Sequence, residues 1–262
     1  MPHLEEFFTH GGGTDFCAGP SAPKDTRPCQ REGDGVRDSG VLYLHGPKGA
    51  GQTSMLLQFG FTQVMAGKNV VLVMCGSAGA SQPTASEIVP VTACSKCGLP
   101  VQTGENNAIW SSINIKYLRS SAELQHFLCS LHVVAKETSV LLVDGFERFF
   151  ADQSHIGSVY QTLAFLLEAR AYMETATGSG TAVVVGNSDA FLLRDRRLLR
   201  RWCRFLEIAP DVREPDVFTL REEVEDAADV SEDVAKTQVK YEFVLQGANA
   251  NFQLLHVQTR SE

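Results

Sequence analysis

The residues most able to do chemistry lie in the segment GPKGAGQTS, at positions 46–54. Loops that cradle phosphate groups follow the pattern G-x-x-x-x-G-K-[ST], in which backbone N–H groups at the start of a helix point at phosphate oxygens. Gly46, Gly51 and Thr53 match this pattern, whereas Gln52 stands where the lysine belongs. The segment therefore predicts a phosphate-binding loop without the cation of its pattern.

The absent lysine limits what this loop can do. A hydrogen bond to a charged group contributes about 1.5–3 kcal/mol, which corresponds to roughly 10- to 150-fold in nucleotide affinity. Transition-state stabilisation suffers more, because charge develops on the transferred phosphoryl group. Lys48 lies inside the loop, but its position does not match the missing lysine. We expect weak nucleotide binding with slow or absent hydrolysis, and the alternative is a tight turn that binds nothing.

Two further polar residues end apolar runs. Asp144 ends the run at 139–145, and such a carboxylate orients the magnesium shell in nucleotide-binding proteins. Asn187 ends another run and either senses the terminal phosphate or is simply a polar residue at a strand end. No glutamate follows the run at 69–76 to serve as a general base. We predict ATP and Mg²⁺ as cofactors, Asp144 as the catalytic residue, and Gly46, Gly49, Gly51, Gln52, Thr53, Ser54 and Asn187 as the cofactor-binding residues.

The elements that must position these residues follow from hydrophobic periodicity. Continuous apolar runs predict strands, and apolar residues at helical spacing predict the helices between them. The predicted strands are 41–46, 69–76, 113–118, 139–145 and 181–188, and the predicted helices are 53–67, 121–134 and 158–175. This alternation is typical of an α/β fold with a mostly parallel sheet and helices on both faces.

The remaining segments complete the predicted domain organisation. Residues 1–39 are expected to form a disordered arm. Residues 40–212 form the core, with an irregular insertion at 77–107. Residues 213–262 hold an acidic loop at 222–233 and a terminal β-hairpin of 238–246 with 251–258, and are expected to complete the same domain.

The composition limits the cellular compartment and the classes of partner that we expect. The formal net charge is −8, so contact with nucleic acid requires a local basic patch. The seven scattered cysteines do not form a disulfide framework and fit a reducing compartment. The first residues lack a secretory signal, and no apolar run approaches the roughly 20 residues of a membrane span. We expect an intracellular soluble protein without membrane contact.

One basic patch stands out in this acidic chain. A helix over 193–204 would carry arginines along one stripe, and such a stripe can follow the phosphates of single-stranded DNA. Trp202 would be available for base stacking if it is exposed. The alternative is a solvated or subunit-contacting helix face. The predicted DNA-binding residues are Arg197, Arg200, Arg201 and Arg204.

Other side chains are candidates for metal binding or packing. Cys94 and Cys97 have the C-x2-C spacing of zinc sites, but zinc takes about four ligands and no second pair follows. We predict no metal site, with this pair as the candidate that stays open beside two free thiols. Packing in the core or against a partner explains His126, Cys129 and His132 on one predicted helix, and packing or subunit docking explains Phe146, Phe149 and Phe150.

The motifs together resemble a known family. INIKYLRSSAELQHFLCSLH, SVLLVDGFERFF and YQTLAFLLEAR are similar to RecA-type recombinase paralogues, specifically the ATPase-like subunit that partners a SWIM-type zinc-finger protein in the animal Shu complex. The similarity covers roughly 41–210 and is strongest at 113–170. It implies a RecA-like P-loop core, single-stranded DNA binding, a SWIM-type partner and support of RecA-family recombinase filaments in nuclear homologous recombination and DNA repair after DNA damage. Gln52 departs from the lysine expected there.

Two other functions remain open. One is an active P-loop ATPase or small-molecule kinase, which would show robust hydrolysis of Mg·ATP. The other is a scaffold subunit that binds neither nucleotide nor DNA.

Overall fold

A computed structural model describes most of the chain. The described residues are 4–8, 41–76, 89, 111–151, 156–187, 196–223, 236–245 and 250–260. The predicted insertion at 77–107 therefore lies outside the described residues, except for Val89.

A nine-stranded sheet forms the centre of the molecule, in the order β3-β2-β4-β5-β1-β6-β7-β8-β9. The first six strands of this order, from β3 to β6, pair with one another in parallel. The last three strands, β7, β8 and β9, are each antiparallel to the strand before them. Their bounds are β1 Val41–Gly46, β2 Val70–Cys75, β3 Ile113–Leu118, β4 Val140–Asp144, β5 Thr181–Asn187, β6 Cys203–Pro210, β7 Val217–Glu222, β8 Lys236–Val244 and β9 Asn251–Arg260. The prediction of a mostly parallel α/β sheet is confirmed.

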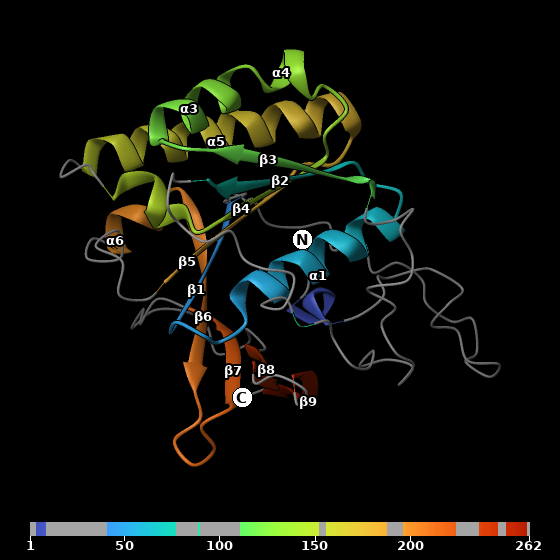
Figure 1. Ribbon diagram of the computed structural model, residues 1–262, viewed down its shortest axis with the longest axis vertical. Coiled ribbons are helices and arrows are strands. Elements are labelled where there is room, and N and C mark those ends of the chain that lie inside the picture. The colour runs from blue at the N-terminus through green and yellow to red at the C-terminus, as the bar shows by residue number, and fades with distance from the viewer. Residues whose placement is uncertain are drawn as a thin grey trace.

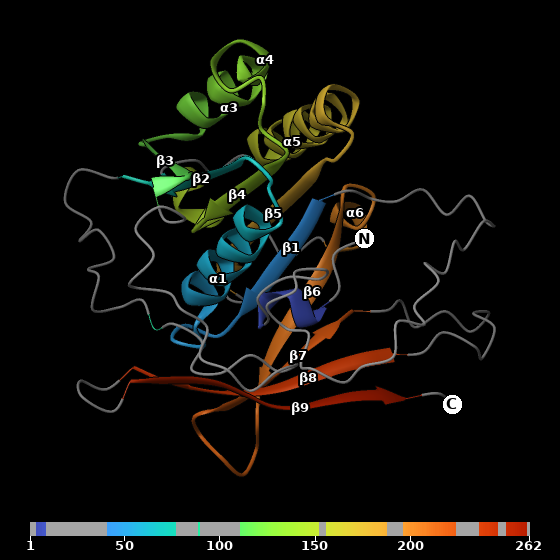
Figure 2. The same ribbon diagram turned by 90° about the vertical axis from the view of Figure 1, so that its right-hand side faces the viewer.

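Helices cover both faces of the parallel strands (Figure 1 and Figure 2). The long helix α1 packs on one face, and α3, α4 and α5 lie together over the other. The bounds are α1 Gln52–Met65, α3 Ser121–Cys129, α4 Leu131–Val134, α5 Ile156–Thr177 and α6 Arg196–Leu199, with 3-10 helices η1 Leu4–Phe7 and η4 Phe146–Phe150. Of the helices in these ranges, none has both the length and the apolar character that crossing a bilayer requires.

Burial explains why the central strands read as continuous apolar runs. Every residue of β1 and β4 is buried, because each strand is covered by a helical layer on both sides. Alternate residues enter different cores: Leu42 and Leu44 pack on the α1 side, whereas Val41 and Tyr43 pack on the α5 side.

The predicted helix over 121–134 is interrupted in the structure. Its amino end is as predicted, because the Ser120 hydroxyl accepts a hydrogen bond from the backbone N–H of Glu123. The helix ends at Cys129, and the Ser130 hydroxyl donates to the carbonyl of His126 at 2.7 Å. A side chain bonded back to a helical carbonyl competes with the regular backbone ladder, which matches a break at this residue.

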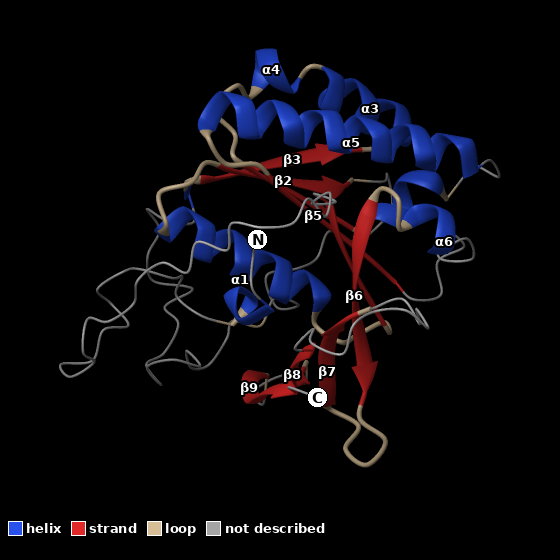
Figure 3. Cartoon of the chain, turned by 180° about the vertical axis from the view of Figure 1, so that it is seen from behind, coloured by secondary structure: helices blue, strands red, loops and turns tan. Residues whose placement is uncertain are grey.

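The carboxy-terminal hairpin is confirmed, and it belongs to the main sheet. Strands β8 and β9 pair antiparallel and attach through β7, which the sequence reading missed (Figure 3). The predicted acidic loop at 222–233 is wrong at its start: Glu222 ends β7, and the Glu223 side chain is 8% exposed. Residues 224–235 lie outside the described residues.

The prediction of a disordered arm is wrong for residues 4–8. Here η1 lies between α1 and β8, and Phe7 and Phe8 are almost completely buried. The Phe7 ring stacks on Phe59 of α1, and the Phe8 ring meets Tyr241 of β8 at a centroid distance of 5.4 Å. Two adjacent aromatic side chains thus hold the beginning of the chain against the core. Residues 9–40 lie outside the described residues.

Candidate functional site

The predicted phosphate loop joins β1 to α1 at the carboxyl edge of the parallel strands. Gly49 and Gly51 have φ angles of +87° and +80°, and Gly51 directly precedes the first residue of α1. A side chain at either φ is strained, so glycine suits both positions. The first N–H groups of a helix have no partner within it, so the loop and helix together offer donors to an anion at this edge.

Residues from the end of the chain pack against this loop. A Cβ added at Gly46 would lie 2.6 Å from Cβ of Ile208, and one added at Gly51 would lie 2.5 Å from the ring of Phe243. The buried Tyr241 hydroxyl donates to the carbonyl of Ala50 at 2.8 Å. Strands β6 and β8 therefore support the loop from the core side and require both glycines of the motif.

Gln52 closes the loop from within. Its side chain is buried, and the amide Nε2 donates to the carbonyl of Pro47 at 2.8 Å. The amide is neutral, so it satisfies the loop's own backbone without bringing a positive charge to it. Lys48 is exposed at the tip of the loop.

Thr53 and Asp144, one from each predicted motif, are in direct contact. The Thr53 hydroxyl is 3.1 Å from each carboxylate oxygen of Asp144, although the two residues are 91 positions apart. Burial raises the pKa of Asp144 above its ordinary value of 3.8, and the hydrogen bond from Thr53 opposes that shift. A hydroxyl beside a buried carboxylate is a pair of hard oxygen ligands, which is the chemistry that Mg²⁺ prefers.

These residues fit a magnesium–nucleotide complex in part. Thr53 and Asp144 would hold the metal, directly or through its waters, and the glycine loop would hold phosphate oxygens by its backbone. The metal would neutralise phosphate charge when bound. Gln52 stands at the position from which the motif lysine would reach the terminal phosphate.

The other predicted binding residues divide into two groups. Asn187 ends β5 and pairs in register with Gly46, so it lies at the same edge. Its Nδ2 donates to Glu147 Oε1 at 2.8 Å. Ser54 is not brought into this group, because its buried hydroxyl accepts from the backbone N–H of Val89 at 3.0 Å.

Glu147 was missed by the sequence reading. It lies in η4, three positions after Asp144, within GFERFF, whose phenylalanines dominate the pattern. Phe146, Phe149 and Phe150 are buried in the α5-side core, so their packing role is confirmed and the suggestion that they dock a subunit is wrong. The sequence did contain one sign of Glu147: a charged residue among phenylalanines directly after the predicted strand.

The predicted arginine stripe is wrong. The helix α6 covers only Arg196–Leu199, and Arg204 lies on β6, so the four arginines do not share one helix face. Cys203 and Phe205 are buried and alternate with Arg204, and Cys203 pairs with Val41 of β1. This strand pairing overrides the helical spacing. Trp202 is partly buried against the α5-side core.

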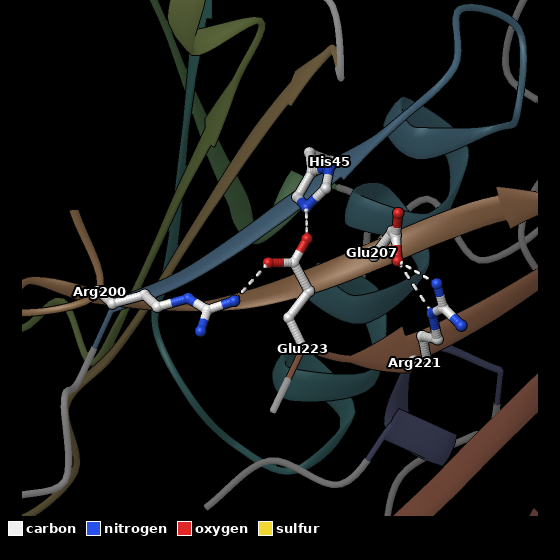
Figure 4. Close-up of polar contacts among 5 residues, drawn as sticks. All are labelled: His45, Arg200, Glu207, Arg221 and Glu223. Carbon is white, nitrogen blue, oxygen red and sulfur yellow. Dashed lines mark hydrogen bonds and ion pairs between the residues drawn. The ribbon is translucent and has the colours of Figure 1, made fainter. Parts of the chain in front are cut away.

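Two of these arginines form ion pairs. Arg200 contacts Glu223 at 3.1 Å, and the other oxygen of Glu223 is 2.8 Å from Nε2 of the buried His45 (Figure 4). Arg204 contacts Glu222 at 2.6 Å. Arg201 is exposed, and the side chain of Arg197 lies outside the described residues.

Glu223 therefore links the turn after α6 to the residue that precedes the loop glycine Gly46. An ionised carboxylate only accepts hydrogen bonds, so pairing with ionised Glu223 requires the form of His45 that has a hydrogen on Nε2. Figure 4 shows a second pair beside it, in which Arg221 of β7 contacts Glu207 of β6 at 2.7 Å. The contact between His45 and Glu223 was not predicted, because the two residues lie 178 positions apart in the chain.

The remaining candidates from the sequence are the possible metal ligands and the side chains expected to pack in the core or against a partner. Cys94 and Cys97 lie outside the described residues. Within the part of the chain that the structure describes, no three His, Cys, Asp or Glu side chains lie close enough to hold a metal ion. His126, Cys129 and His132 are exposed, so the suggestion that they pack in the core is wrong, whereas contact with a partner stays a prediction.

Comparison with solved structures matches this architecture. The chain superposes on the RadB recombinase with a TM-score of 0.51 at 14% identity, over 83% of this chain and 91% of that one. The fold is RecA-like. A second RecA-like neighbour is the flagellar accessory protein FlaH from Methanocaldococcus jannaschii, with a TM-score of 0.50 at 7% identity, over 83% of this chain and 90% of that one. No protein-family model matches the sequence, and no curated protein does either.

Proposed function

We propose that this chain is a nucleotide-binding, RecA-like subunit of a homologous-recombination DNA-repair complex, with weak or absent ATP hydrolysis. The observation that carries the nucleotide part is the contact of Thr53 with Asp144 at 3.1 Å beside the glycine loop. Gln52 in place of the lysine is the reason for weak turnover, because the loop meets phosphate charge without a cation.

Recombination is proposed on two grounds. The first is the likeness to the RadB recombinase, which extends over most of both chains. The second is the resemblance of the segments at 113–170 to the subunit that partners a SWIM-type protein in the Shu complex. The likeness to a flagellar accessory protein supports a RecA-like subunit within an assembly, without indicating DNA.

We propose single-stranded DNA as a ligand and Arg201 as the arginine that contacts it. Arg200 and Arg204 have carboxylate partners at 3.1 Å and 2.6 Å, so much of their charge is compensated within the protein. Arg201 is exposed beside them. Arg197 remains a candidate from the sequence.

DNA binding is tested by fluorescence anisotropy with a single-stranded oligonucleotide at several salt concentrations. Each lost phosphate contact should reduce the salt slope by about 0.7. Arg201→Ala is expected to weaken binding and reduce the slope by about that amount. Arg213→Ala, in the turn at the other end of β6, is the matched control. Equal affinity of the wild-type protein and Arg201→Ala would refute the assignment.

The proposed partners are a SWIM-type zinc-finger protein and a recombinase of the RecA family, in the nucleus. Co-expression of the chain with candidate SWIM-type proteins, followed by purification and calorimetric titration of the complex with Mg·ATP, tests partner and nucleotide together. A stable one-to-one complex that binds nucleotide is the expected result. A chain that binds neither nucleotide nor single-stranded DNA in such a complex would support the scaffold alternative.

A further inference from the structure

Glu147 is a carboxylate at the carboxyl edge of the parallel strands, where the predicted phosphate loop lies, and it belongs to neither sequence motif. Its Oε1 accepts a hydrogen bond from Asn187 at 2.8 Å, and Asn187 pairs with Gly46 at the start of the loop. Asp144, which contacts Thr53, lies three positions before it and is close enough to affect its ionisation. Glu147 is therefore held at the sheet edge where the loop and the predicted magnesium ligands meet.

The second oxygen of Glu147 is left without a partner. Oε2 is buried and has no hydrogen bond within the described part of the chain, and the same is true of the Tyr43 hydroxyl. Gly186 provides the room for both: a Cβ there would lie 2.4 Å from the tyrosine oxygen and 3.0 Å from Oε2. Both oxygens thus lie directly against Gly186, in the place that a side chain at 186 would need.

This arrangement is unfavourable for folding. A buried polar atom without a hydrogen bond carries its full desolvation cost, and burial is the main reason that the pKa of Glu147 is raised. Glu223 is the contrast within the same protein, because each of its oxygens has a partner. A carboxylate that costs stability at a candidate site is typical of a group kept for proton transfer.

We propose that Glu147 is the general base for hydrolysis of a nucleoside triphosphate, with Asn187 positioning it; this rests on the nucleotide binding proposed above. Water attacks the terminal phosphorus, and the bond from that phosphorus to the bridging oxygen breaks. The leaving diphosphate takes the bonding electron pair. The proton of the attacking water passes to the Glu147 carboxylate and then to solvent. Glu147 would do the work of the glutamate that is absent after β2, and Gln52 alone would limit turnover.

The experiment uses the full chain with the lysine restored. Gln52→Lys is expected to hydrolyse Mg·ATP at least tenfold faster than the wild-type protein. Adding Glu147→Gln should leave the Kd for Mg·ATP within twofold and reduce kcat by about 10²- to 10⁴-fold. The control adds Glu168→Gln on the exposed face of α5 instead, and should change neither value.

A second readout needs no nucleotide. Glu147→Gln in the wild-type chain should raise the melting temperature of the nucleotide-free protein, because a neutral amide replaces a buried carboxylate. A variant that fails to fold, or melts lower, would show that the carboxylate is structural and would overturn the proposal.

The kinetic outcomes separate this proposal from the proposed function. If Gln52→Lys binds Mg·ATP but does not hydrolyse it, or if Glu147→Gln leaves its turnover intact, the base assignment is wrong while nucleotide binding stands. If neither the wild-type protein nor Gln52→Lys binds Mg·ATP, the proposed function is wrong, and the assignment of Glu147 is refuted with it.

Discussion

The Thr53 hydroxyl lies 3.1 Å from both carboxylate oxygens of Asp144, although 91 positions separate the two residues in the chain. Such a contact arises when the end of β4 and the start of α1 meet at the same edge of the sheet. The fold therefore brings together the two side chains that we propose as magnesium ligands.

Asp144→Asn should abolish the magnesium dependence of nucleotide binding. The amide cannot supply the negative charge that holds the metal shell, so we expect ATP affinity to become equal in Mg²⁺ and in EDTA. The wild-type protein should bind about tenfold more tightly in Mg²⁺, a difference of about 1.4 kcal/mol. Calorimetric titration measures both. Asp216→Asn, in the exposed turn before β7, should behave as wild type; loss of binding in that control would point to a general charge effect.

Gln52→Lys should raise nucleotide affinity. A charged hydrogen bond replaces a neutral one, and about 1.5–3 kcal/mol corresponds to a gain of roughly 10- to 150-fold. Gln161→Lys on the exposed side of α5 adds the same charge elsewhere and should change affinity less than twofold. Equal gains in both variants would mean that net charge, rather than the loop, governs binding.

Gly51→Ala should destabilise the protein more than Gly178→Ala. Both glycines have positive φ, +80° and +73°, so each substitution carries a similar strain of about 1–2 kcal/mol. Only at Gly51 would the new methyl overlap the ring of Phe243, at 2.5 Å, and overpacking adds about 1–3 kcal/mol. Urea unfolding compares the two, and equal losses would show that β8 does not press on the loop.

Glu223→Gln should be far more destabilising than Glu222→Gln. Glu223→Gln removes the carboxylate charge that faces both Arg200 and the fully buried His45, and breaking a buried ion pair costs roughly 3–5 kcal/mol. Glu222 is 39% exposed, and surface ion pairs contribute about 0–1 kcal/mol. Thermal and urea unfolding measure the difference. Similar losses for the two neighbours would contradict a buried link at Glu223.

The metal-free protein should lose stability as pH rises because of Asp144 and Glu147. Burial raises the folded-state pKa of both above their ordinary values of 3.8 and 4.5. Between the ordinary and the raised values the folded state binds more protons than the unfolded state, so the free energy of unfolding falls with increasing pH. The contribution is most favourable below the ordinary values.

This pH effect is measured as a difference between proteins, because other carboxyl groups act in the opposite direction. Hydrogen bonds lower the pKa of Asp211, for example. Urea unfolding of the wild-type protein and of Asp144→Asn/Glu147→Gln in EDTA gives two curves against pH. The variant should gain relative stability as pH rises. Arg148 is the neighbouring charged group and opposes the rise in both pKa values, whereas burial raises the pKa of Tyr43 well above its ordinary value and keeps its hydroxyl neutral. Parallel curves would contradict the prediction.

Local patterns predicted the features that depend on local chemistry. The apolar runs correctly indicated β1, β2, β4 and β5 because these strands are buried by the layers above and below them. The predicted strand β3 is also present, but it lies at the edge of the sheet and most of its residues are exposed. Gly46 and Gly51 indicated the loop because a tight turn from strand to helix selects glycine in any context. Thr53 and Asp144 were named from the motif, and the structure brings them into contact. Their role in binding magnesium stays a prediction.

The features that the sequence did not predict depend on contacts between residues that are far apart in the chain. Arg204 reads as helical by spacing, but its place is set by the pairing of β6 with β1. The partners of Arg200 and Arg204 come from the end of β7, a strand that was not predicted. Glu147 became a site residue only when Asn187, 40 positions away, proved to be its hydrogen-bond donor.

The hydrogen bond from Tyr241 to Ala50 joins positions 191 residues apart, and Phe243 packs on Gly51 from the same strand. A loop that depends on so distant a strand cannot reach its final shape on the ribosome until β8 has emerged. Contacts of high sequence separation also form slowly, because loop-closure entropy must be overcome first. The phosphate loop, encoded early in the chain, is therefore expected to mature late in folding, and a chain that stops before β8 should carry the motif without its geometry.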